Sequence, residues 1–557
     1  MVRKLVFSPN NNRTRVWLLF VLGLFVFGVQ CTFVTARTNG QCLNDGDCRA
    51  RGPSFAQTRC SAVGICEQVV LPEAGAVSGG PCTTNAECNQ RLSTKARCVA
   101  SQCVSITNAS CQTVDGDPTD PNAIFVGVLT PRSGPNGDFG LNQYAVVKSA
   151  AAEWQSSLSG VAGAHSFVTI GCDEISNTPS ATSFLSATIQ ASAIFGPIYD
   201  ADFEQALPIA TANGTFLFGS RVDDPKLSTM AGIGKTIWSS APNRKIQVKY
   251  FQNLINILEP SVRSTFSITT GDIKVAFLVG SDPSSSNFAD AVEALPFTFN
   301  GKSLAQNQTN AKYVRVPVPI SFSTDNIYSS AVSSLVADTA NLPDLVLVAQ
   351  EYDLLNLVRA IQNGWPTGKF PRFVFFTEDP AVDTELGLPQ ERFAGKLDFV
   401  KWSRSPAEST TASAFAVSYR TASGGDPAAY SEFLYDAFYE NAYALQSILD
   451  ANGNQLFSLD PGAYANAIAG FDAPGTLVNV GPGTTTPNNI VQMLGLLSSK
   501  GDADLDGASG PLEFDPAAGS PIQDAELDCI TAGGQVKQSS VKFSGASGAA
   551  SGTYSCL

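Results

Sequence analysis

From residue 123 onward the sequence repeats one pattern, in which a short apolar run is followed by a segment with helical periodicity. The first run, Ala123–Thr130, is apolar almost throughout, as a parallel strand buried on both faces should be. Further strands are expected at Phe167–Gly171, Ala193–Phe195, Thr215–Gly219, Lys274–Gly280, Leu345–Ala349 and Arg372–Phe376. Helices are expected near Leu141–Leu158, Ser180–Thr188 and Phe203–Asn213. This alternation predicts an α/β fold with parallel sheets flanked by helices, and the number of units favours two lobes.

Residues 1–36 have the pattern of an export signal peptide. Four basic residues precede the apolar run Val16–Val29, and Val34-Thr35-Ala36 supplies small or short residues before a cleavage point. The apolar run is too short to span a bilayer comfortably, so we expect cleavage and no membrane insertion afterwards. An uncleaved anchor is the alternative. The mature chain is therefore expected to be periplasmic, at the cell surface or secreted.

The chain is strongly acidic, with 35 Lys and Arg residues against 49 Asp and Glu residues. Loss of the signal peptide removes four basic side chains and changes the net charge from −14 to −18. Such a chain repels phosphate backbones and anionic membrane surfaces, which argues against a nucleic-acid partner.

Residues 37–111 form a separate cysteine-rich segment with an internal repeat. The two copies have corresponding cysteines 40, 40, 38 and 37 residues apart: Cys42, Cys48, Cys60 and Cys66, then Cys82, Cys88, Cys98 and Cys103. Each copy is too short to bury a core of its own, so two disulfides per copy are expected to stabilise it. Zinc is the alternative, but zinc sites usually have close CxxC pairs. The segment resembles small extracellular repeats of the Dickkopf or EGF kind. Its function could be that of a spacer or of a module that contacts another protein.

The remaining cysteines also suggest an exported, oxidised chain. Cleavage after Ala36 would remove Cys31 and leave twelve, an even number. Cys529 and Cys556 both lie near the C-terminus and are expected to form a disulfide. Cys111 and Cys172 then remain and are expected to form another. Residues 112–122, polar and containing proline, are expected to be a linker.

Four motifs beyond this linker occur in the order and spacing of a known family. They are VGVLTPRSGPNGDFG at 126–140, FGPIYD with ALPIA at 195–210, DPKLS at 224–228 and DGASGPLEFD at 506–515. With them the chain resembles type I periplasmic solute-binding proteins of the leucine/isoleucine/valine-binding class, over about residues 123–530. The resemblance implies two hinged lobes that close on a ligand. Lobe 1 would comprise about residues 123–242 and 403–515. Lobe 2 would comprise about residues 243–402 and 516–530. Residues 531–557 would form a C-terminal tail.

The resemblance also implies which residues of lobe 1 face the ligand. The family's Ser and Thr groups for a ligand carboxylate match Asp200, beside Tyr199, and Asp223, beside Val222. Because a buried Asp would repel a carboxylate, this departure favours a cationic or polyhydroxylated ligand over an amino acid. Asp200 could instead cap the helix that follows, and Asp223 could occupy a solvated turn.

Four further positions complete the implied site. Glu378 matches the family's acidic residue for a ligand ammonium group. Phe139 and Phe288 fall where the family places aromatic rings around the ligand side chain. Gln350 falls in the loop of lobe 2 that faces the cleft.

Metal and catalytic motifs are weak. Four acidic residues fit the EF-hand spacing, Asp502, Asp504, Asp506 and Glu513, but Pro511 begins a strand where an EF-hand requires a helix, so calcium is a minor alternative. His165 is the only histidine, and its Gly-Ala-His-Ser context is typical of a surface loop. With no Walker loop and no GxSxG motif, we expect neither an enzyme nor a cofactor.

The sequence thus predicts a protein that captures a small polar molecule between two lobes, with an ABC permease as its partner. The candidate ligands are an amino acid, an amide, or a cationic or polyhydroxylated solute. The alternative is an extracellular sensory or protein-interaction module that keeps the fold without transport and contacts a surface protein. The cysteine-rich segment favours the alternative, whereas Glu378 and the late hairpin favour ligand binding.

Overall fold

In a computed structural model of the chain, two compact units can be distinguished, Met1–Glu73 and Ala74–Leu557. The structure describes residues 81–158, 165–219, 224–319, 326–339, 341–350, 354–366, 371–376, 398–404, 410–428, 430–452, 461–472, 474–483, 488–530 and 536–555. In the first unit it describes two short antiparallel strands, β1 (Thr58–Cys60) and β2 (Cys66–Gln68). The expected signal peptide lies outside the described residues. Within the described part of the chain, no helix combines the length and the apolar character that a membrane crossing requires.

Lobe 1 is built on a six-stranded sheet with the order β10-β9-β8-β6-β7-β5. Five strands run parallel: β6 (Ile124–Thr130), β7 (Phe167–Asp173), β8 (Ala193–Phe195), β9 (Phe216–Gly219) and β10 (Ile237–Ser239). All seven residues of β6 are buried, which explains its continuous apolar run. The expected strands of this lobe are confirmed to within two residues at each end.

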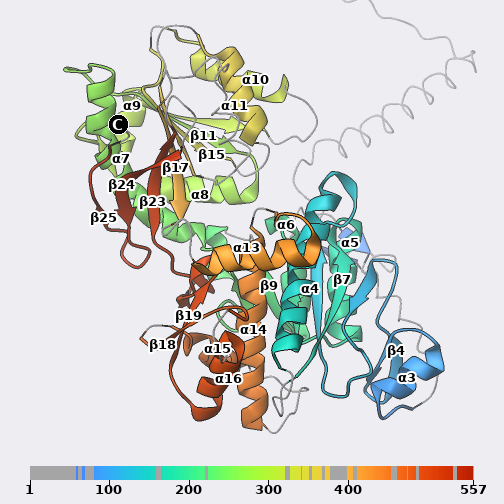
Figure 1. The fold of residues 1–557 in the computed structure, drawn as a ribbon. Coiled ribbons are helices and arrows are strands. Elements are labelled where there is room, and N and C mark those ends of the chain that lie inside the picture. The colour runs from blue at the N-terminus through green and yellow to red at the C-terminus, as the bar shows by residue number, and fades with distance from the viewer. Residues whose placement is uncertain are drawn as a thin grey trace, which may run out of the picture. The chain divides into compact units, whose positions relative to one another are not determined.

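Helices cover both faces of this sheet, as the α/β prediction requires. One face carries α4 (Gly137–Ser157), α14 (Ser431–Asn452), α15 (Pro461–Ala469) and α16 (Asn489–Ser499) in one hydrophobic core. The other carries α5 (Glu174–Ser183), the turn η3 (Phe184–Thr188) and α6 (Asp200–Ala212). Helices α4 and α14 lie side by side (Figure 1). Between them the ring of Trp154 packs against those of Tyr439 and Tyr443.

The described residues of lobe 1 also form several further elements. They are η2 (Gly134–Asn136), η4 (Pro225–Thr229), α13 (Thr410–Ser423), β18 (Thr476–Asn479), β19 (Ala503–Gly507), β20 (Gly510–Pro511), β21 (Phe514–Asp515) and β22 (Ser520–Pro521). Leu505 on β19 and Phe514 on β21 are buried in the same core as α14, as is Leu512 between β20 and β21. Segments about 380 residues away from β6 therefore complete its lobe.

Lobe 2 has an eight-stranded sheet with the order β14-β11-β15-β16-β17-β23-β24-β25. The parallel strands are β11 (Val275–Gly280), β14 (Tyr313–Val318), β15 (Leu345–Ala349), β16 (Arg372–Phe375) and β17 (Asp398–Arg404). Strands β23 (Ala525–Ile530), β24 (Val536–Phe543) and β25 (Ala550–Ser551) extend it in antiparallel fashion. Residues 531–557, expected to be a tail, thus contribute strands to this sheet.

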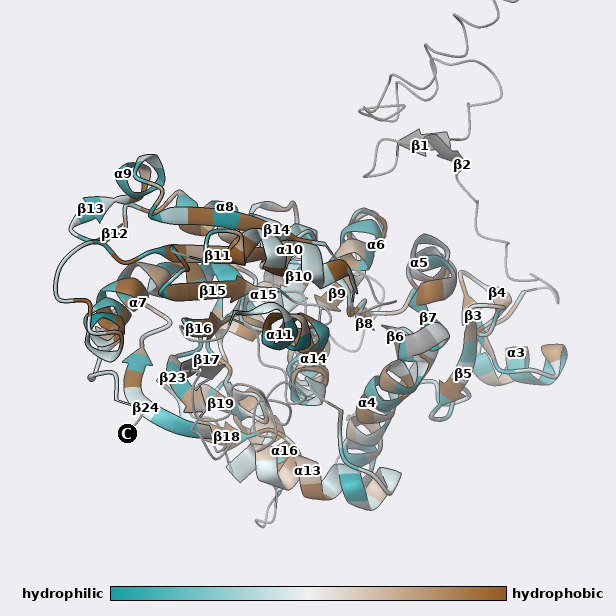
Figure 2. Cartoon of the chain, turned by 90° about the horizontal axis from the view of Figure 1, so that it is seen from above, coloured by the Kyte–Doolittle hydropathy of each residue, from teal (hydrophilic) through white to brown (hydrophobic). Residues whose placement is uncertain are grey.

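Successive residues of β11 and β15 enter different cores, so both faces of this sheet are covered too (Figure 2). Helices α7 (Arg244–Thr265) and α8 (Pro283–Glu293) pack on one face, and α10 (Asn326–Val336) and α11 (Leu354–Gly364) on the other. A small excursion at the sheet edge comprises β12 (Thr298–Phe299), β13 (Lys302–Ser303) and α9 (Leu304–Thr309). The predicted fold class is confirmed.

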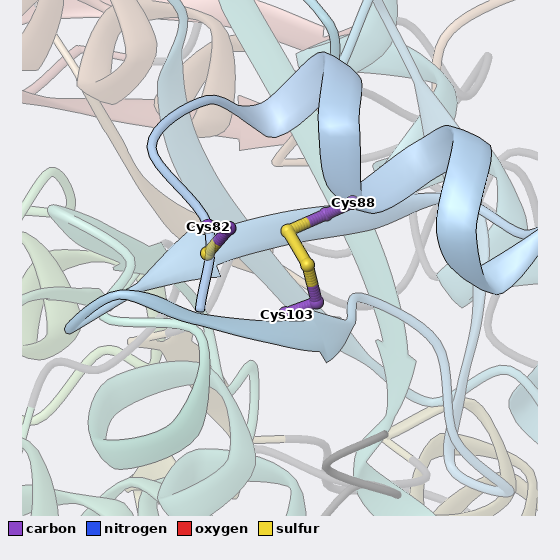
Figure 3. A group of neighbouring side chains, drawn as sticks. All are labelled: Cys82, Cys88 and Cys103. Atoms are coloured by element: carbon purple, nitrogen blue, oxygen red, sulfur yellow. A yellow bond between two sulfur atoms is a disulfide. The ribbon is translucent and has the colours of Figure 1, made fainter. Parts of the chain in front are cut away.

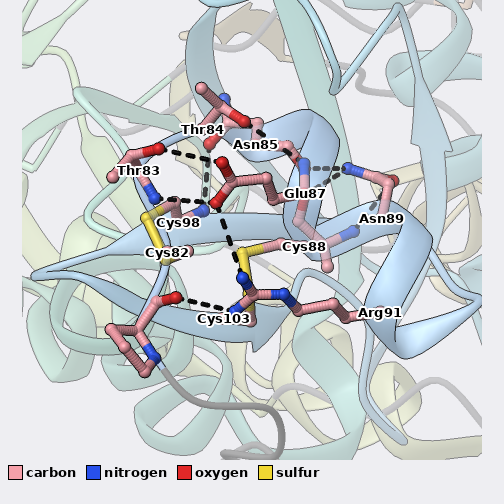
Figure 4. The surroundings of a disulfide bond; sticks show 12 residues. Cys82, Thr83, Thr84, Asn85, Glu87, Cys88, Asn89, Arg91, Cys98 and Cys103 are labelled. Carbon is pink, nitrogen blue, oxygen red and sulfur yellow. Dashed lines mark hydrogen bonds and ion pairs between the residues drawn. A yellow bond between two sulfur atoms is a disulfide. The ribbon is translucent and has the colours of Figure 1, made fainter.

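The second cysteine-rich copy consists of α3 (Asn85–Leu92), β3 (Ala96–Val99) and β4 (Gln102–Ser105). Two disulfides close it, Cys82–Cys98 and Cys88–Cys103, as expected for one copy (Figure 4). This copy belongs to the same compact unit as lobe 1. The expected linker 112–122 begins as a strand, β5 (Cys111–Asp115), which pairs with β7, and the expected Cys111–Cys172 disulfide joins the two.

Candidate functional site

The carboxyl ends of parallel strands are where α/β folds place ligands, and in both lobes these ends carry polar residues. In lobe 1 the segment after β8 holds Tyr199 and Asp200, and Asp173 and Glu174 stand at the end of β7. In lobe 2 Asp282 follows β11 and Gln350 follows β15. Of the eight residues predicted to contact a ligand, Tyr199, Asp200 and Gln350 occupy such strand ends.

The conformation of the segment after β8 depends on a glycine. Gly196 has φ +95°, and a Cβ there would lie 2.0 Å from the Leu129 carbonyl oxygen, so only glycine fits. The Tyr199 hydroxyl accepts a hydrogen bond from Asn136 Nδ2 at 2.5 Å, which ties the segment after β8 to the one after β6. Tyr199 and the loop that presents it are therefore held in place by two neighbouring strand ends.

Asp200 is the first residue of α6 and only 6% exposed. The N-cap position belongs to Tyr199, whose side chain makes no capping bond, so Asp200 does not play the capping role weighed from the sequence. A carboxylate in the first turn is favoured by the helix dipole, which helps this site hold negative charge.

Glu174 was missed by sequence reasoning. It is buried directly after β7, and its Oε2 accepts a hydrogen bond from the Ile198 amide at 3.0 Å. Burial raises its pKa well above the ordinary range, and the negative charges of Asp202 and Asp173 act in the same direction. Glu174 therefore supports the loop that carries Tyr199 and Asp200. An acidic residue at the end of a continuous apolar run was the signal that could have found it.

Lobe 2 contributes a buried polar cluster around Gly280, the last residue of β11. A Cβ at Gly280 would lie 2.5 Å from Asp282 Oδ2, 2.6 Å from Gln350 Oε1 and 3.1 Å from Ser285 Oγ. Asp282 also caps α8, because its Oδ1 accepts a hydrogen bond from the Ser285 amide at 2.6 Å. The end of β15 and the start of α8 thus place an amide, a carboxylate and a hydroxyl side by side.

The two predicted aromatic residues differ in their surroundings. Phe139 lies in the first turns of α4 and is partly exposed. Phe288 is fully buried in the core of lobe 2, with its ring centroid 5.3 Å from that of Phe376 and the Arg244 guanidinium 5.8 Å from its own. Val222, Asp223 and Glu378 lie outside the described residues, and their roles stay predictions.

Asp224, which follows Val222 and Asp223 in the sequence, lies among the described residues, and its side chain joins the two lobes. It is 1% exposed, and its Oδ1 accepts a hydrogen bond from the Lys226 amide at 2.8 Å. Its Oδ2 accepts a second hydrogen bond, also 2.8 Å long, from Asn287 Nδ2 on α8 of lobe 2. The sequence placed this residue in the DPKLS motif without assigning it a role.

The late hairpin has a structural role. Asp504 and Asp506 lie on β19, which pairs antiparallel with β20 where an EF-hand would need a helix. The turn amides of Ala508 and Ser509 donate hydrogen bonds to Asp436 on α14, both at 2.7 Å. Asp502 directly precedes β19 and Glu513 directly precedes β21, so these acids lie on a hairpin and not on the helix–loop–helix of an EF-hand.

Among the described residues, one group of potential metal ligands lies close together, Cys82, Cys88 and Cys103 (Figure 3). Both disulfides of the second copy engage them, so they offer no thiolate to a metal. His165, expected on the surface, is instead buried, and its Nδ1 lies 2.8 Å from the Asn122 carbonyl oxygen. That expectation was wrong because His165 itself contacts α14, where Gln446 Oε1 accepts a hydrogen bond from the His165 amide.

Comparison with known proteins places the fold. No protein-family model and no curated protein matches the chain. A possible leucine/isoleucine/valine-binding protein from Rhodopirellula baltica matches with a TM-score of 0.52 and 14% identity, covering 76% of this chain and 98% of that one. An ABC transporter solute-binding protein from R. palustris, in complex with benzoate, matches with a TM-score of 0.50 and 14% identity, covering 75% and 95%. The chain therefore has the two-lobed fold of type I periplasmic binding proteins, as its four motifs predicted.

Proposed function

We propose that this chain is an extracytoplasmic solute-binding protein that captures a small polar molecule in a cleft between its two lobes. The observation that carries the proposal is the set of polar groups at the strand ends of both lobes. Lobe 1 contributes Tyr199 and Asp200, and lobe 2 contributes Gln350 beside Asp282. Hydrogen-bonding groups from both sides can hold a ligand that bridges them, which is how two-lobed proteins couple binding to closure.

The charge of these groups narrows the ligand class. Asp200 and Asp224 in lobe 1 and Asp282 in lobe 2 are all buried carboxyl groups. An anionic ligand group beside them would be repelled, whereas an ammonium group or several hydroxyls would be attracted. Of the candidate ligands, a cationic or polyhydroxylated solute therefore fits better than a carboxylate bound at Asp200.

The proposed partner is an ABC permease, as for the solute-binding proteins with this fold. Loss of the chain should then abolish uptake of its solute by the cells that produce it. The alternative, an interaction or sensory module, is favoured by one observation: the second cysteine-rich copy is fixed to lobe 1 and enlarges its surface. That alternative predicts normal uptake in cells that lack the chain.

A thermal-shift screen tests the binding function directly. The oxidised, exported chain is screened against amino acids, polyamines, sugars and amides, with calcium included. A ligand at a hundredfold excess over its Kd stabilises the folded state by about 2.7 kcal/mol, which raises the melting temperature. Asp200→Asn and Gln350→Ala should both abolish the shift, because each removes a polar group from one side of the site.

The matched control is Asp290→Asn on α8, whose side chain is 65% exposed on the surface of lobe 2. It should keep the full shift. The binding proposal fails if no solute raises the melting temperature, or if the Asp200 and Gln350 variants respond like the wild type.

A further inference from the structure

We propose that the hydrogen bond between Asn287 of lobe 2 and Asp224 of lobe 1 is a clasp that holds the lobes together and sets how readily the protein closes. This inference rests on the proposed function, since closure is what would bury a ligand. The bond is 2.8 Å long and runs from Asn287 Nδ2 to Asp224 Oδ2. Around it α8 contacts both η4 and α6, so α8 is an element of lobe 2 that lies directly against lobe 1.

The acceptor of this bond is held rigidly. Asp224 is buried, and its Oδ1 is engaged by the Lys226 amide at the start of η4. Its backbone oxygen accepts a hydrogen bond from Asn243 Nδ2 at 2.9 Å. A carboxylate fixed in this way presents Oδ2 to Asn287 in one orientation, and hydrogen bonds to a charged acceptor are stronger than neutral ones.

Asn243 connects the clasp to the crossings between the lobes. It lies where the chain passes from β10 of lobe 1 into α7 of lobe 2, and its Oδ1 caps α7 by accepting the Lys245 amide at 2.8 Å. Its own amide donates to Ser520 Oγ at 3.3 Å, on the segment where the chain returns to lobe 2. Asp224 therefore bonds to the hinge through its main chain and to the opposite lobe through its side chain.

Any opening that separates α8 from η4 must break the Asn287–Asp224 bond. Breaking it removes one of the hydrogen bonds that the buried Asp224 carboxylate accepts, and a bond to a charged acceptor contributes more than one between neutral groups. Before a ligand arrives, the clasp thus favours the arrangement in which α8 contacts η4 and α6, which in this proposal is the closed one. Since apparent affinity falls in proportion to the fraction of closed protein, Asn287 and Asp224 would act as positioning residues for binding.

The test measures the distance between the lobes in the full chain without ligand. Fluorophores are attached through non-canonical amino acids at Val417 on α13 of lobe 1 and Val314 on β14 of lobe 2, which are 60% and 38% exposed. Single-molecule energy transfer then gives the ratio of closed to open molecules. Asn287→Ala should shift this ratio towards the open state by about tenfold or more, as expected for a lost hydrogen bond to a charged group.

A second variant and a control make the result specific. Asn287→Asp should shift the ratio further, because it places a second carboxylate against Asp224. Asn253→Ala removes a 2.8 Å bond to the Gly548 carbonyl oxygen within lobe 2 and should leave the ratio unchanged. The clasp is ruled out if both Asn287 variants keep the wild-type distribution. Because no ligand is present, that outcome leaves the thermal-shift test of solute binding unaffected.

Discussion

Glu440 lies in the middle of α14 with 0% exposure, and neither of its carboxylate oxygens has a hydrogen-bond partner. Burial raises its pKa well above the ordinary value, and the charges of Asp436 and Asp472 add to the effect. Burial also raises the pKa of Asp436 to about 7 and that of Asp472 to about 6. Lobe 1 therefore holds carboxyl groups that keep their protons in the folded state at pH values where the unfolded chain ionises them.

This predicts that the protein loses stability as the pH rises. Below the ordinary carboxyl pKa, near 4.5, Glu440 is protonated in both the folded and the unfolded state, so its ionisation does not change the free energy of unfolding. Above it, the unfolded state releases the proton first, so the free energy of unfolding falls by up to about 1.4 kcal/mol per pH unit until the folded pKa is reached. Glu440→Gln should remove this part of the decline. Urea denaturation should then give nearly equal stabilities at pH 4, below the ordinary carboxyl pKa, and a more stable variant at pH 8.

Asp138→Asn, at an exposed position in the first turn of α4, is the control and should keep the decline that Glu440 causes. Asp436 and Asp472 will keep some decline in every variant. Parallel pH profiles for the wild type and Glu440→Gln would show that Glu440 is not held neutral.

At the scale of elements, Arg97 on β3 helps to fix the second cysteine-rich copy to lobe 1, beside Val99 and Val104, which are buried in a core of that lobe. Arg97 is 6% exposed, and its Nη1 donates hydrogen bonds to the carbonyl oxygens of Ile189 at 2.5 Å and Gln190 at 2.9 Å. Its guanidinium also lies 4.3 Å from the ring centroid of Phe125 on β6. Burial lowers the pKa of Arg97 to about 10, which still leaves it charged near neutral pH. The copy is therefore a rigid extension of the lobe.

Arg97→Ala should loosen this extension without unfolding the lobe. The two hydrogen bonds and the contact with Phe125 are expected to contribute about 2–4 kcal/mol. Native-state hydrogen exchange should show this loss in the amides of β3 and β4 and leave those of β6 protected. Arg91→Ala is the control from the same copy. Arg91 is 41% exposed and pairs with Glu87 at 3.8 Å, so its removal should cost no more than about 1 kcal/mol (Figure 4). Equal exchange in both variants would contradict the anchoring role of Arg97.

At the scale of the molecule, a disulfide between positions distant in the sequence joins the start of the α/β region to its second strand. Cys111 and Cys172 are 61 residues apart and link β5 to β7. Cross-links that close long loops restrict the unfolded chain most. Cys529 is also disulfide-bonded, while Cys556 lies outside the described residues, so their pairing stays a prediction.

Replacing Cys111 and Cys172 together with serine should lower the global free energy of unfolding by about 4 kcal/mol, the chain-entropy value for a loop of this length. Urea denaturation followed by tryptophan fluorescence measures it, since Trp154 lies in the core of lobe 1. The Cys82 and Cys98 double serine variant opens a shorter loop of 16 residues in the small copy and should leave this transition nearly unchanged. An unchanged midpoint in the first variant would show that the disulfide does not stabilise the lobe.

The sequence by itself determined the fold class and most of the parallel strands inside the two sheets, because a strand buried on both faces must be apolar along its whole length. The runs of β6, β8 and β15 carry that requirement visibly. It also showed that the second copy should contain two disulfides of its own, since the cysteine spacing reveals the repeat. The sequence pattern did not predict the edge strand β5, because an edge strand needs few apolar residues. Its sequence, CQTVD, largely falls within the predicted linker.

Only the tertiary structure decided which distant residues meet at the candidate site. Asp224 and Asn287 are 63 residues apart, and Glu174 and Ile198 are 24 residues apart, and no local pattern links either pair. Such contacts depend on how whole strands and helices pack, since a hydrogen bond has a reach of about 3 Å and carries no signal along the chain. The sequence could therefore place Asp200 and Gln350 at strand ends, but it could not show that Asp224 joins the two lobes.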